Sequence, residues 1–357
     1  MKVGVPKELK DNENRVGLTP EGAAALAAAG HDVLIERNAG LGCGIENRDY
    51  QAAGARLCSA DEAWATELVI KVKEPLESEY RYFGGQIVFA YFHLSGLDRA
   101  LTAALLRSGT TALAYETVED ENGRFPLLAP MSAIAGSMAP LMGSYYLAKS
   151  NGGRGTLIGE LLGQRHGKVV ILGDGVVGRN ACRVASALGG RVFIFGLFPE
   201  RAAELERLYA GVQYVLSTPE NLARHLQDAD LLVGAVLRPG ARAPHVVTEA
   251  MVKSMPEGSV IVDVSIDQGG CVATSRPTSH SDPVFIAHGV IHYCVTNMPG
   301  AYPRTSTFAL TGATLPYVSR IANGGIAAVL ADPGFAKGVN THKGHIAYEA
   351  VAAALGL

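Results

Sequence analysis

The chain has 357 residues and a formal net charge of −3 at pH 7, with 48% hydrophobic and 18% charged residues. This composition supplies ample apolar material for a core and excludes a disordered or fibrous chain. The near-neutral charge offers no basic surface for nucleic acid, and the length favours two domains over one.

In the first half of the chain, short β-branched runs alternate with stretches rich in Ala and Leu. This alternation predicts parallel βαβ units. The predicted strands cover 2–5, 33–37, 68–73, 87–92 and 111–116, and the predicted helices cover 20–29, 48–54, 97–107 and, as a buried connecting helix, 131–149.

The second half repeats this pattern and ends in a tail that we expect to return to the first half. The predicted strands cover 168–173, 191–195, 212–216, 230–236, 259–264 and 291–296; the predicted helices cover 177–188, 199–209, 219–226, 248–254, 306–323 and 345–354. The pattern predicts the α/β fold class, with two α/β domains and a doubly wound sheet in the second half.

The cysteines and the apolar runs indicate a cytoplasmic protein. The five cysteines, at 43, 58, 182, 271 and 294, show neither zinc-site spacing nor a disulfide framework, which suits a reducing compartment. The first residues lack the apolar stretch of a signal peptide. No uncharged apolar run reaches about 18 residues, so no membrane helix is expected.

The clearest local motif is the run Gly173-Asp174-Gly175-Val176-Val177-Gly178, which follows the predicted strand KVVIL and opens a predicted helix. Gly173 permits a tight turn, Gly175 lets the backbone approach a pyrophosphate, and Gly178 lets helix and strand pack closely. The phosphates would meet free N–H groups at the helix N-terminus. A glycine turn in a ligand-free domain is the alternative, but the flanking strand and helix favour dinucleotide binding.

The next strand lacks the acid that usually follows such a motif. About 20 residues on, a carboxylate normally accepts a hydrogen bond from the ribose 2′-OH, but this sequence has Gly196 there. Without this carboxylate, the cofactor could be either NAD(H) or NADP(H). Arg201 could meet a 2′-phosphate, although a solvated helix arginine is the preferred interpretation, and Glu200 could replace the acid. A Gly196→Asp change is expected to shift preference toward NAD.

Four polar residues follow predicted strands, where open α/β sheets place their ligands. They are Arg15, Lys73, His93 and Asp267. An Arg and a Lys together can hold a small carboxylate, and a His and an Asp can exchange protons beside a hydride-transfer site. Each residue taken singly also suits an ordinary structural role. His288 and His292 lack further ligands, so no metal site is expected.

In their order along the chain, eleven segments resemble the L-alanine dehydrogenase family. They are VGVPKE at 3–8, NRVGLTP at 14–20, KVKEP at 71–75, YFHL at 91–94, AYETV at 114–118, LLAPMS at 127–132, GDGVVG at 173–178, RPGARAP at 238–244, DVSIDQGG at 263–270, NMPG at 297–300 and ADPGFAKG at 331–338.

The resemblance implies two Rossmann-like doubly wound domains with a cleft between them, joined by two long helices. The substrate domain would be made of 1–127 and 305–357, and the dinucleotide-binding Rossmann domain would cover 128–304. It implies reversible oxidative deamination of L-alanine to pyruvate and ammonium with NAD(H), or with NADP(H) because of Gly196, in a homohexamer. No nucleic acid or membrane partner is expected.

The resemblance also implies roles for residues at matching positions. Arg15 and Lys73 would hold the substrate carboxylate, His93 would be the acid–base group at the carbonyl oxygen, and Asp267 would assist proton transfer at the amine. The cofactor-binding set would be Ser132, Gly173, Asp174, Gly175, Val176, Val177, Gly178, Gly196, Asp267, Asn297 and Met298.

Besides Gly196, two departures from the family pattern concern loops. Residues 159–163 read GELLG without the family's proline, and Ala133 follows Ser132 where the family has an acid. Alternative functions are a dehydrogenase or reductive aminase for another small amino or oxo acid, a transhydrogenase component, and a non-catalytic dinucleotide-binding protein. The retained Arg15, Lys73, His93 and Asp267 argue against the last two.

Overall fold

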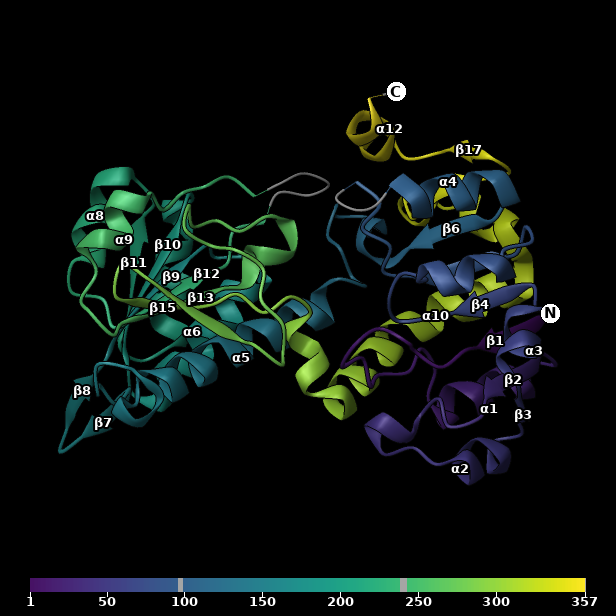
Figure 1. Ribbon diagram of the computed structural model, residues 1–357, viewed down its shortest axis with the longest axis horizontal. Helices are drawn as coiled ribbons and strands as arrows, with labels where there is room; N and C mark the ends of the chain where they lie inside the picture. The colour runs from purple at the N-terminus through teal and green to yellow at the C-terminus, as the bar shows by residue number, and fades with distance from the viewer. Residues whose placement is uncertain (96–98, 238–242, 357) are drawn as a thin grey trace. The chain divides into compact units, whose positions relative to one another are not determined.

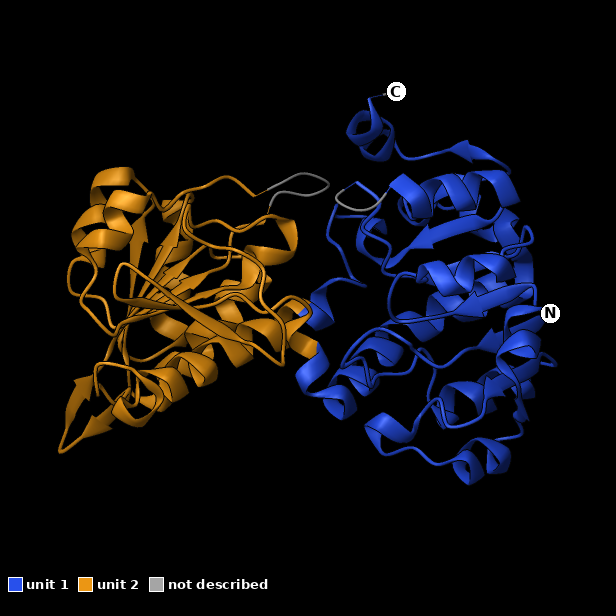
Figure 2. Cartoon of the chain, in the orientation of Figure 1, with its two compact units in different colours: residues 1–131, 300–357 blue, residues 132–299 orange. Residues whose placement is uncertain are grey.

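The computed structural model describes residues 1–95, 99–237 and 243–356. They form two compact units: unit 1 contains Met1–Met131 and Gly300–Leu357, and unit 2 contains Ser132–Pro299 (Figures 1 and 2). The first two residues of the predicted helix 97–107 and most of the segment 238–244 lie outside the described residues.

Unit 1 is built on an eight-stranded sheet in the order β17-β16-β6-β5-β4-β1-β2-β3. Strands β1 to β6 pair in parallel, and β16 joins β6 antiparallel. The strands are β1 (Lys2–Val5), β2 (Asp32–Glu36), β3 (Arg56–Cys58), β4 (Leu68–Ile70), β5 (Ile87–Ala90), β6 (Thr111–Ala114), β16 (Val339–His342) and β17 (His345–Ile346).

Helices flank this sheet (Figure 1). They are α1 (Pro20–Ala28), α2 (Asn47–Ala52), α3 (Ala60–Trp64), α4 (Arg99–Ser108), α10 (Pro303–Leu330), α11 (Pro333–Ala336) and α12 (Glu349–Leu355), with short 3-10 turns at η1 (Leu41–Cys43), η2 (Glu77–Tyr82) and η3 (Tyr115–Thr117). The start of α1 follows from its sequence: Thr19 caps the helix by accepting from the Gly22 N–H, and Pro20 occupies the first turn, where proline is favoured.

Unit 2 is built on a seven-stranded sheet in the order β11-β10-β9-β12-β13-β15-β14. All neighbours pair in parallel except β14, which joins β15 antiparallel. The strands are β9 (Lys168–Leu172), β10 (Arg191–Gly196), β11 (Val212–Leu216), β12 (Leu231–Gly234), β13 (Val260–Asp263), β14 (Val284–Ala287) and β15 (Val290–Tyr293), with a separate hairpin of β7 (Gly159–Leu161) and β8 (Gln164–His166).

Helices accompany this sheet too. They are α5 (Ala129–Leu147), α6 (Val176–Leu188), α7 (Ala202–Leu208), α8 (Pro219–Leu226) and α9 (Glu249–Ser254), with 3-10 turns at η4 (Lys149–Asn151), η5 (Pro199–Arg201), η6 (Val264–Gln268) and η7 (Met298–Ala301). Alternate residues of β9 enter two different apolar clusters, Val169 and Ile171 on one side and Val170 and Leu172 on the other. Burial on both faces is expected of a central parallel strand.

The parallel strands of each sheet follow the doubly wound order 3-2-1-4-5-6, which confirms the predicted α/β fold class. In each sheet the direction of winding reverses beside the first strand. The switch point lies between β1 and β4 in unit 1 and between β9 and β12 in unit 2. Ligands of open α/β sheets bind outside the carboxyl ends of strands at such points.

The first segment of unit 1 ends at Met131, four residues after the expected limit of 127, and its second segment begins at Gly300, five residues before the expected limit of 305. The chain passes from one unit to the other within α5 and within η7. The first three residues of α5 belong to unit 1 and the rest to unit 2, whereas α10 lies wholly in unit 1. The C-terminal tail does return to the first half, since Val339 of β16 pairs with Leu113 of β6.

Candidate functional site

Three of the proposed site residues follow neighbouring strands of the unit 1 sheet. Arg15 lies after β1, Lys73 after β4 and His93 after β5, and these strands are adjacent and parallel. Because the carboxyl ends of parallel strands share one edge, the three residues lie along the same edge, next to the switch point. This arrangement can bring two cations and an imidazole to one small ligand.

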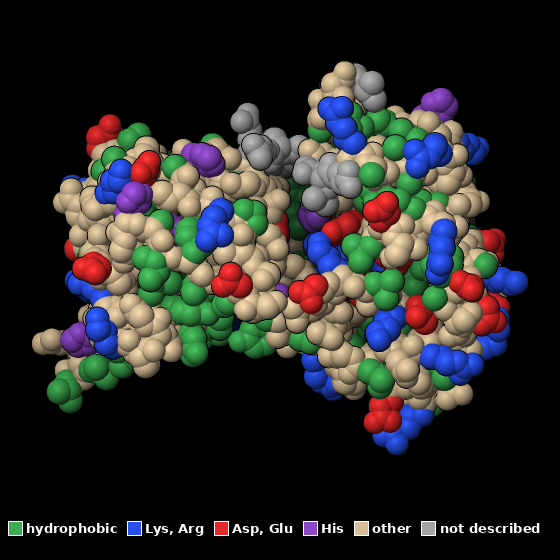
Figure 3. All heavy atoms as spheres, in the orientation of Figure 1, with side chains coloured by type: hydrophobic (Ala, Val, Ile, Leu, Met, Phe, Trp, Pro, Cys, Tyr) green, Lys and Arg blue, Asp and Glu red, His purple; other side chains and the backbone are tan. Residues whose placement is uncertain are grey.

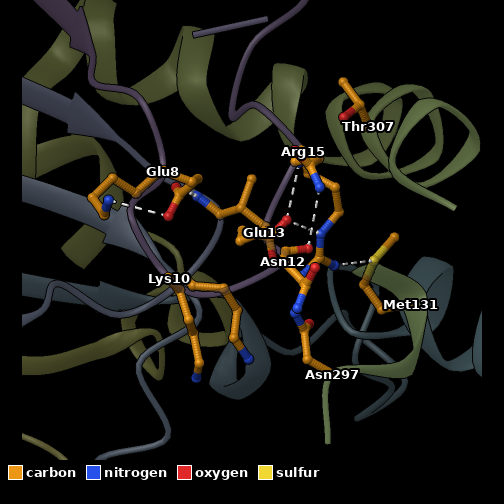
Figure 4. A network of polar contacts seen from close by, with 12 residues as sticks. Glu8, Lys10, Asn12, Glu13, Arg15, Met131, Asn297 and Thr307 are labelled. Atoms are coloured by element: carbon orange, nitrogen blue, oxygen red, sulfur yellow. Dashed lines mark hydrogen bonds and ion pairs between the residues drawn. The ribbon is translucent and has the colours of Figure 1, made fainter. Parts of the chain in front are cut away.

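The Arg15 guanidinium is held by an acid that the sequence did not single out. Its Nε lies 2.6 Å from Glu13 Oε1, and Nη2 contacts Glu13 Oε2 (Figure 4). Nη1 donates to Met131 Sδ at 3.1 Å. Burial disfavours the charged form of Arg15. The hydrogen bonds and the negative charge of Glu13 outweigh this effect of burial and raise the pKa of Arg15. Arg15 is therefore fixed in place as a cation, with an exposed fraction of only 2%.

Of the two lysines in the KVKEP segment, the structure distinguishes one as structural. Lys71 is completely buried, with Nζ 3.1 Å from Glu8 Oε2 and 3.0 Å from Glu79 Oε1. Burial disfavours its charge, but the two carboxylates outweigh burial and raise its pKa. Glu8 also accepts from the Val72 N–H at 2.6 Å. This triad ties the ends of β1 and β4 together.

Lys73 occupies a different environment at the same edge. Its Nζ lies 3.8 Å from Glu74 Oε2, beyond hydrogen-bond distance. Glu74 Oε1 is instead bound by Lys10 Nζ at 2.5 Å. Glu74 Oε2 is buried without a hydrogen-bond partner. Lys73 is 8% exposed, so its ammonium is largely removed from water and suited to a second anionic partner.

His93 sits in a strained turn that an acid on the next strand supports. Its φ is +50°, a left-handed conformation uncommon outside glycine. The His93 N–H donates to Glu116 Oε1 at 2.5 Å, and Nδ1 lies 3.9 Å from the same oxygen. The ring stacks on Tyr91 with centroids 6.0 Å apart. Glu116 follows β6, so the strand-end rule used for the other residues also identifies it.

In unit 2 the glycine-rich run joins β9 to α6 and is shaped to receive a phosphate group. Gly173 has φ +102°, and a Cβ there would lie 2.4 Å from the Ala235 carbonyl oxygen. A Cβ on Gly178 would lie 1.8 Å from the Gly173 oxygen, so the helix and turn pack closely. Gly175, the N-cap of α6, instead faces open space where a Cβ would meet nothing within 4 Å.

The first turn of α6 supplies the donors for that open space. Val176 and Val177 follow the N-cap, and Val176 is 46% exposed. The first backbone N–H groups of a helix have no intrahelical acceptor, and the helix dipole favours an anion there. These residues fit the pyrophosphate of a dinucleotide.

The end of β10 differs from the expected ribose site. Beside Gly196, Tyr214 Oη and Asp174 Oδ2 occupy the space into which a side chain would extend. Arg201, expected to be solvated, lies with Nη1 3.0 Å from Asp174 Oδ1. Glu200 is exposed in η5. The expected benefit of Gly196→Asp is not supported, because its Cβ would lie 2.0 Å from Tyr214 Oη.

The remaining predicted residues lie at the carboxyl ends of β13 and β15 and at the start of α5. Asp267 in η6 accepts from the Asn297 N–H, with Oδ1 3.3 Å from N. Asn297 has φ +61°, and Met298 beside it is 3% exposed. Ser132 is half-buried in the first turn of α5. The structure thus brings Asp267 and Asn297 together in unit 2, whereas Arg15, Lys73 and His93 belong to unit 1.

Other classes of site receive no support from the described residues. Within them, no three His, Cys, Asp or Glu side chains gather closely enough to hold a metal ion. None of the helices in this part of the chain has the length and apolar content needed to cross a membrane. Figure 3 shows acidic and basic side chains interspersed over unit 1 on the face that it draws.

Comparison with known proteins identifies the family. Residues 4–135 match the model of the alanine dehydrogenase/PNT N-terminal domain, and residues 139–349 match that of the C-terminal domain. An alanine dehydrogenase of Staphylococcus haemolyticus is 50% identical, over 100% of this chain and 97% of that protein.

Solved structures agree with this assignment. An L-alanine dehydrogenase structure superposes with a TM-score of 0.95 and 48% identity, covering 100% of this chain and 99% of that one. A transhydrogenase from Sinorhizobium meliloti shares the fold, with a TM-score of 0.83 and 23% identity over 97% of this chain and 100% of that one. The chain belongs to the alanine dehydrogenase/PNT family.

Proposed function

We propose that this protein catalyses the reversible oxidative deamination of L-alanine to pyruvate and ammonium with a nicotinamide cofactor. The observation that carries this proposal is the edge of the unit 1 sheet, where Arg15, Lys73 and His93 follow three adjacent strands. In a family whose close relatives are named alanine dehydrogenases, this trio matches a small oxo acid, which has one carboxylate and one reactive carbonyl.

Each of these side chains has a chemical task. Arg15 and Lys73 bind the substrate carboxylate through charge-assisted hydrogen bonds. His93 exchanges a proton with the carbonyl oxygen, and Asp267 assists proton transfer at the amine. Glu116 positions His93 through its backbone N–H. When bound, the nicotinamide supplies or accepts the hydride at the substrate carbon, and the protein orients the reacting groups.

The cofactor is held by unit 2 in this proposal. The backbone of residues 173–178 and the first turn of α6 bind the pyrophosphate, and Ser132, Asn297 and Met298 contact the rest of the cofactor. The glycine turn and the open space at Gly175 support this assignment. We propose NAD(H) as the cofactor.

A paired assay tests the proposed function. Purified protein is mixed with pyruvate and ammonium, with NADH in one cuvette and NADPH in the other, and absorbance is followed at 340 nm. We expect oxidation of the reduced cofactor that depends on both pyruvate and ammonium. Absence of oxidation with both cofactors, in protein shown to be folded, would contradict the function.

The cellular setting and assembly are further parts of the proposal. All five cysteines are free and buried, and burial raises the pKa of Cys182 to about 12, so these thiols suit a reducing cytoplasm. Exposed leucines and a tyrosine on α5 and near the β7–β8 hairpin are candidates for contacts in a homohexamer. They are Leu141, Tyr145, Leu157, Leu161 and Leu162.

A further inference from the structure

The space beside Gly196 is already filled by polar atoms of unit 2. A Cβ built on Gly196 would lie 2.0 Å from Tyr214 Oη and 2.6 Å from Asp174 Oδ2. In most dinucleotide-binding domains, the ribose-binding carboxylate extends from this strand end. Here a carboxylate reaches almost the same place from the glycine-rich turn one strand away.

The Asp174 carboxylate is held firmly there. Arg201 Nη1 donates to Oδ1 at 3.0 Å, and the Tyr214 hydroxyl donates to Oδ2 at 3.3 Å. Tyr214 is fixed in turn, because its oxygen accepts from the Phe198 N–H at 3.1 Å. The Asp174 side chain is only 10% exposed. Few of its orientations are therefore accessible, and the direction of its oxygens is set before any ligand binds.

The carboxylate also retains capacity for a further donor. Two carboxylate oxygens offer about four acceptor positions, and the two side-chain donors use two of them. A ribose hydroxyl would add a charge-assisted hydrogen bond. A 2′-phosphate in the same place would meet a like charge, which disfavours it.

We propose that Asp174 is the specificity-determining residue that replaces the missing acid at position 196 and makes the enzyme prefer NAD(H) over NADP(H). This inference rests on the proposed function, since it concerns the same cofactor. Arg201 acts as a positioning residue for the carboxylate. Its charge is compensated by Asp174, so it does not serve as a receptor for a 2′-phosphate.

The test is to measure binding and turnover of both reduced cofactors in the full-length protein. The Asp174→Asn variant keeps the size of the side chain and removes its charge. We expect the dissociation constant of NADH to rise about 10- to 100-fold, the range of a charge-assisted hydrogen bond. NADPH binding should be unchanged or tighter, since the repulsion is removed and Arg201 is released.

Two further variants make the test specific. Asp228→Asn removes an acid at the opposite end of β9, where it pairs with Lys168, and should leave the NADH/NADPH preference unchanged. Arg201→Ala should weaken NADH binding less than Asp174→Asn does and should not impair NADPH binding.

Three outcomes would overturn the inference, and one of them separates it from the proposed function. If the Asp174→Asn variant and the unaltered protein showed the same preference for NADH over NADPH, Asp174 would not be the residue that determines cofactor choice. The proposed dehydrogenase function would be unaffected by that result. A preference for NADPH that Arg201→Ala abolishes would show that Arg201 binds a 2′-phosphate. Failure of the unaltered, folded protein to bind either cofactor would contradict the function itself.

Discussion

At the scale of single residues, Lys73 is the clearest test of substrate binding. Replacing it with Met keeps the aliphatic stem and removes a charge-assisted contact worth about 1.5–3 kcal/mol. The KM for pyruvate should rise about 10- to 100-fold. The matched control is Lys10→Met, because Lys10 binds the same Glu74 but is not assigned to the substrate. If the KM for pyruvate were the same in the two variants, Lys73 would not be a substrate-binding residue.

His93 can be tested without disturbing its unusual backbone. Asn adopts positive φ more readily than most residues, so His93→Asn should keep the turn while removing the proton-exchanging imidazole. General acid–base catalysis contributes about 10²–10⁴, and kcat should fall by about that factor. NADH titration should give an unchanged dissociation constant. A kcat within about threefold of the original would contradict the assigned role.

The residues that support the site were harder to predict than the residues that form it. Lys73 and His93 stand out because they follow apolar runs, and Arg15 because it lies in a polar loop after the first strand; these are local signals. Glu13 and Tyr214 were not singled out, because their importance depends on contacts that only the folded backbone creates: Glu13 with the Arg15 guanidinium, and Tyr214 with a carboxylate 40 residues earlier. Gly196 was noticed, but the atoms that fill the space beside it were not predictable from its neighbours in the chain.

At the scale of elements, β15 carries a buried histidine that makes stability depend on pH. His292 is fully buried, with Nε2 2.8 Å from Thr274 Oγ1 and Nδ1 3.0 Å from the Val290 oxygen. Burial lowers its pKa below the ordinary 6.5. The unfolded chain then takes up a proton at higher pH than the folded one, so the free energy of unfolding should fall as pH decreases through about 6.5.

The variant His292→Gln keeps polar groups at this position and removes the titration. Urea unfolding at about pH 7 and about pH 5 should show a smaller loss of stability in the variant. His225 and His342 also have lowered pKa values, so part of the pH dependence should remain. A loss as large as that of the unaltered protein would show that His292 does not contribute.

Long, periodic elements were predictable, and short ones were not. The strand of 168–173 and the helix of 219–226 correspond closely to β9 and α8, because β9 is buried throughout and α8 buries Leu222 and Leu226 on one face. The strands β3, β7, β8 and β16 were missed, because their sequences RLC, GEL, QRH and VNTH contain no continuous apolar run like the LVI of β4. β14 was missed as well. The predicted helix 345–354 begins instead as β17, where pairing with β16 overrides helix propensity.

At the scale of the whole molecule, the same doubly wound order appears in both units. The pattern of alternating strands and helices predicts parallel strands with helices on both faces of the sheet, because parallel strands need right-handed crossovers. It does not specify the strand order, since more than one doubly wound order has this alternation. The return of the tail to the unit 1 sheet was also predictable, but its antiparallel pairing with β6 was not, since it depends on an available sheet edge.

Assembly is the property of the whole molecule that a single residue tests most directly. Leu162 and Gly163 form the two-residue turn between β7 and β8, with φ of +51° and +77°. Such turns favour Asn-Gly, yet a leucine stands there with its side chain fully exposed. Apolar side chains gather on the face of unit 2 drawn in Figure 3, including this hairpin. An unfavourable, exposed leucine is best explained by burial against a second copy of the chain.

We therefore expect Leu162→Asn to relieve the turn and weaken self-association at the same time. For the unaltered protein, light scattering coupled to size exclusion should give a mass of six times 37.4 kDa. The variant should give a smaller mass, and the thermal stability of its dissociated chain should not be reduced. Leu208→Asn, at an exposed leucine that ends α7, serves as the control and should keep the full assembly. Because the turn itself gains from Asn, dissociation of the variant cannot be attributed to unfolding of the hairpin. An unchanged mass in Leu162→Asn would place the subunit contacts elsewhere on the molecule.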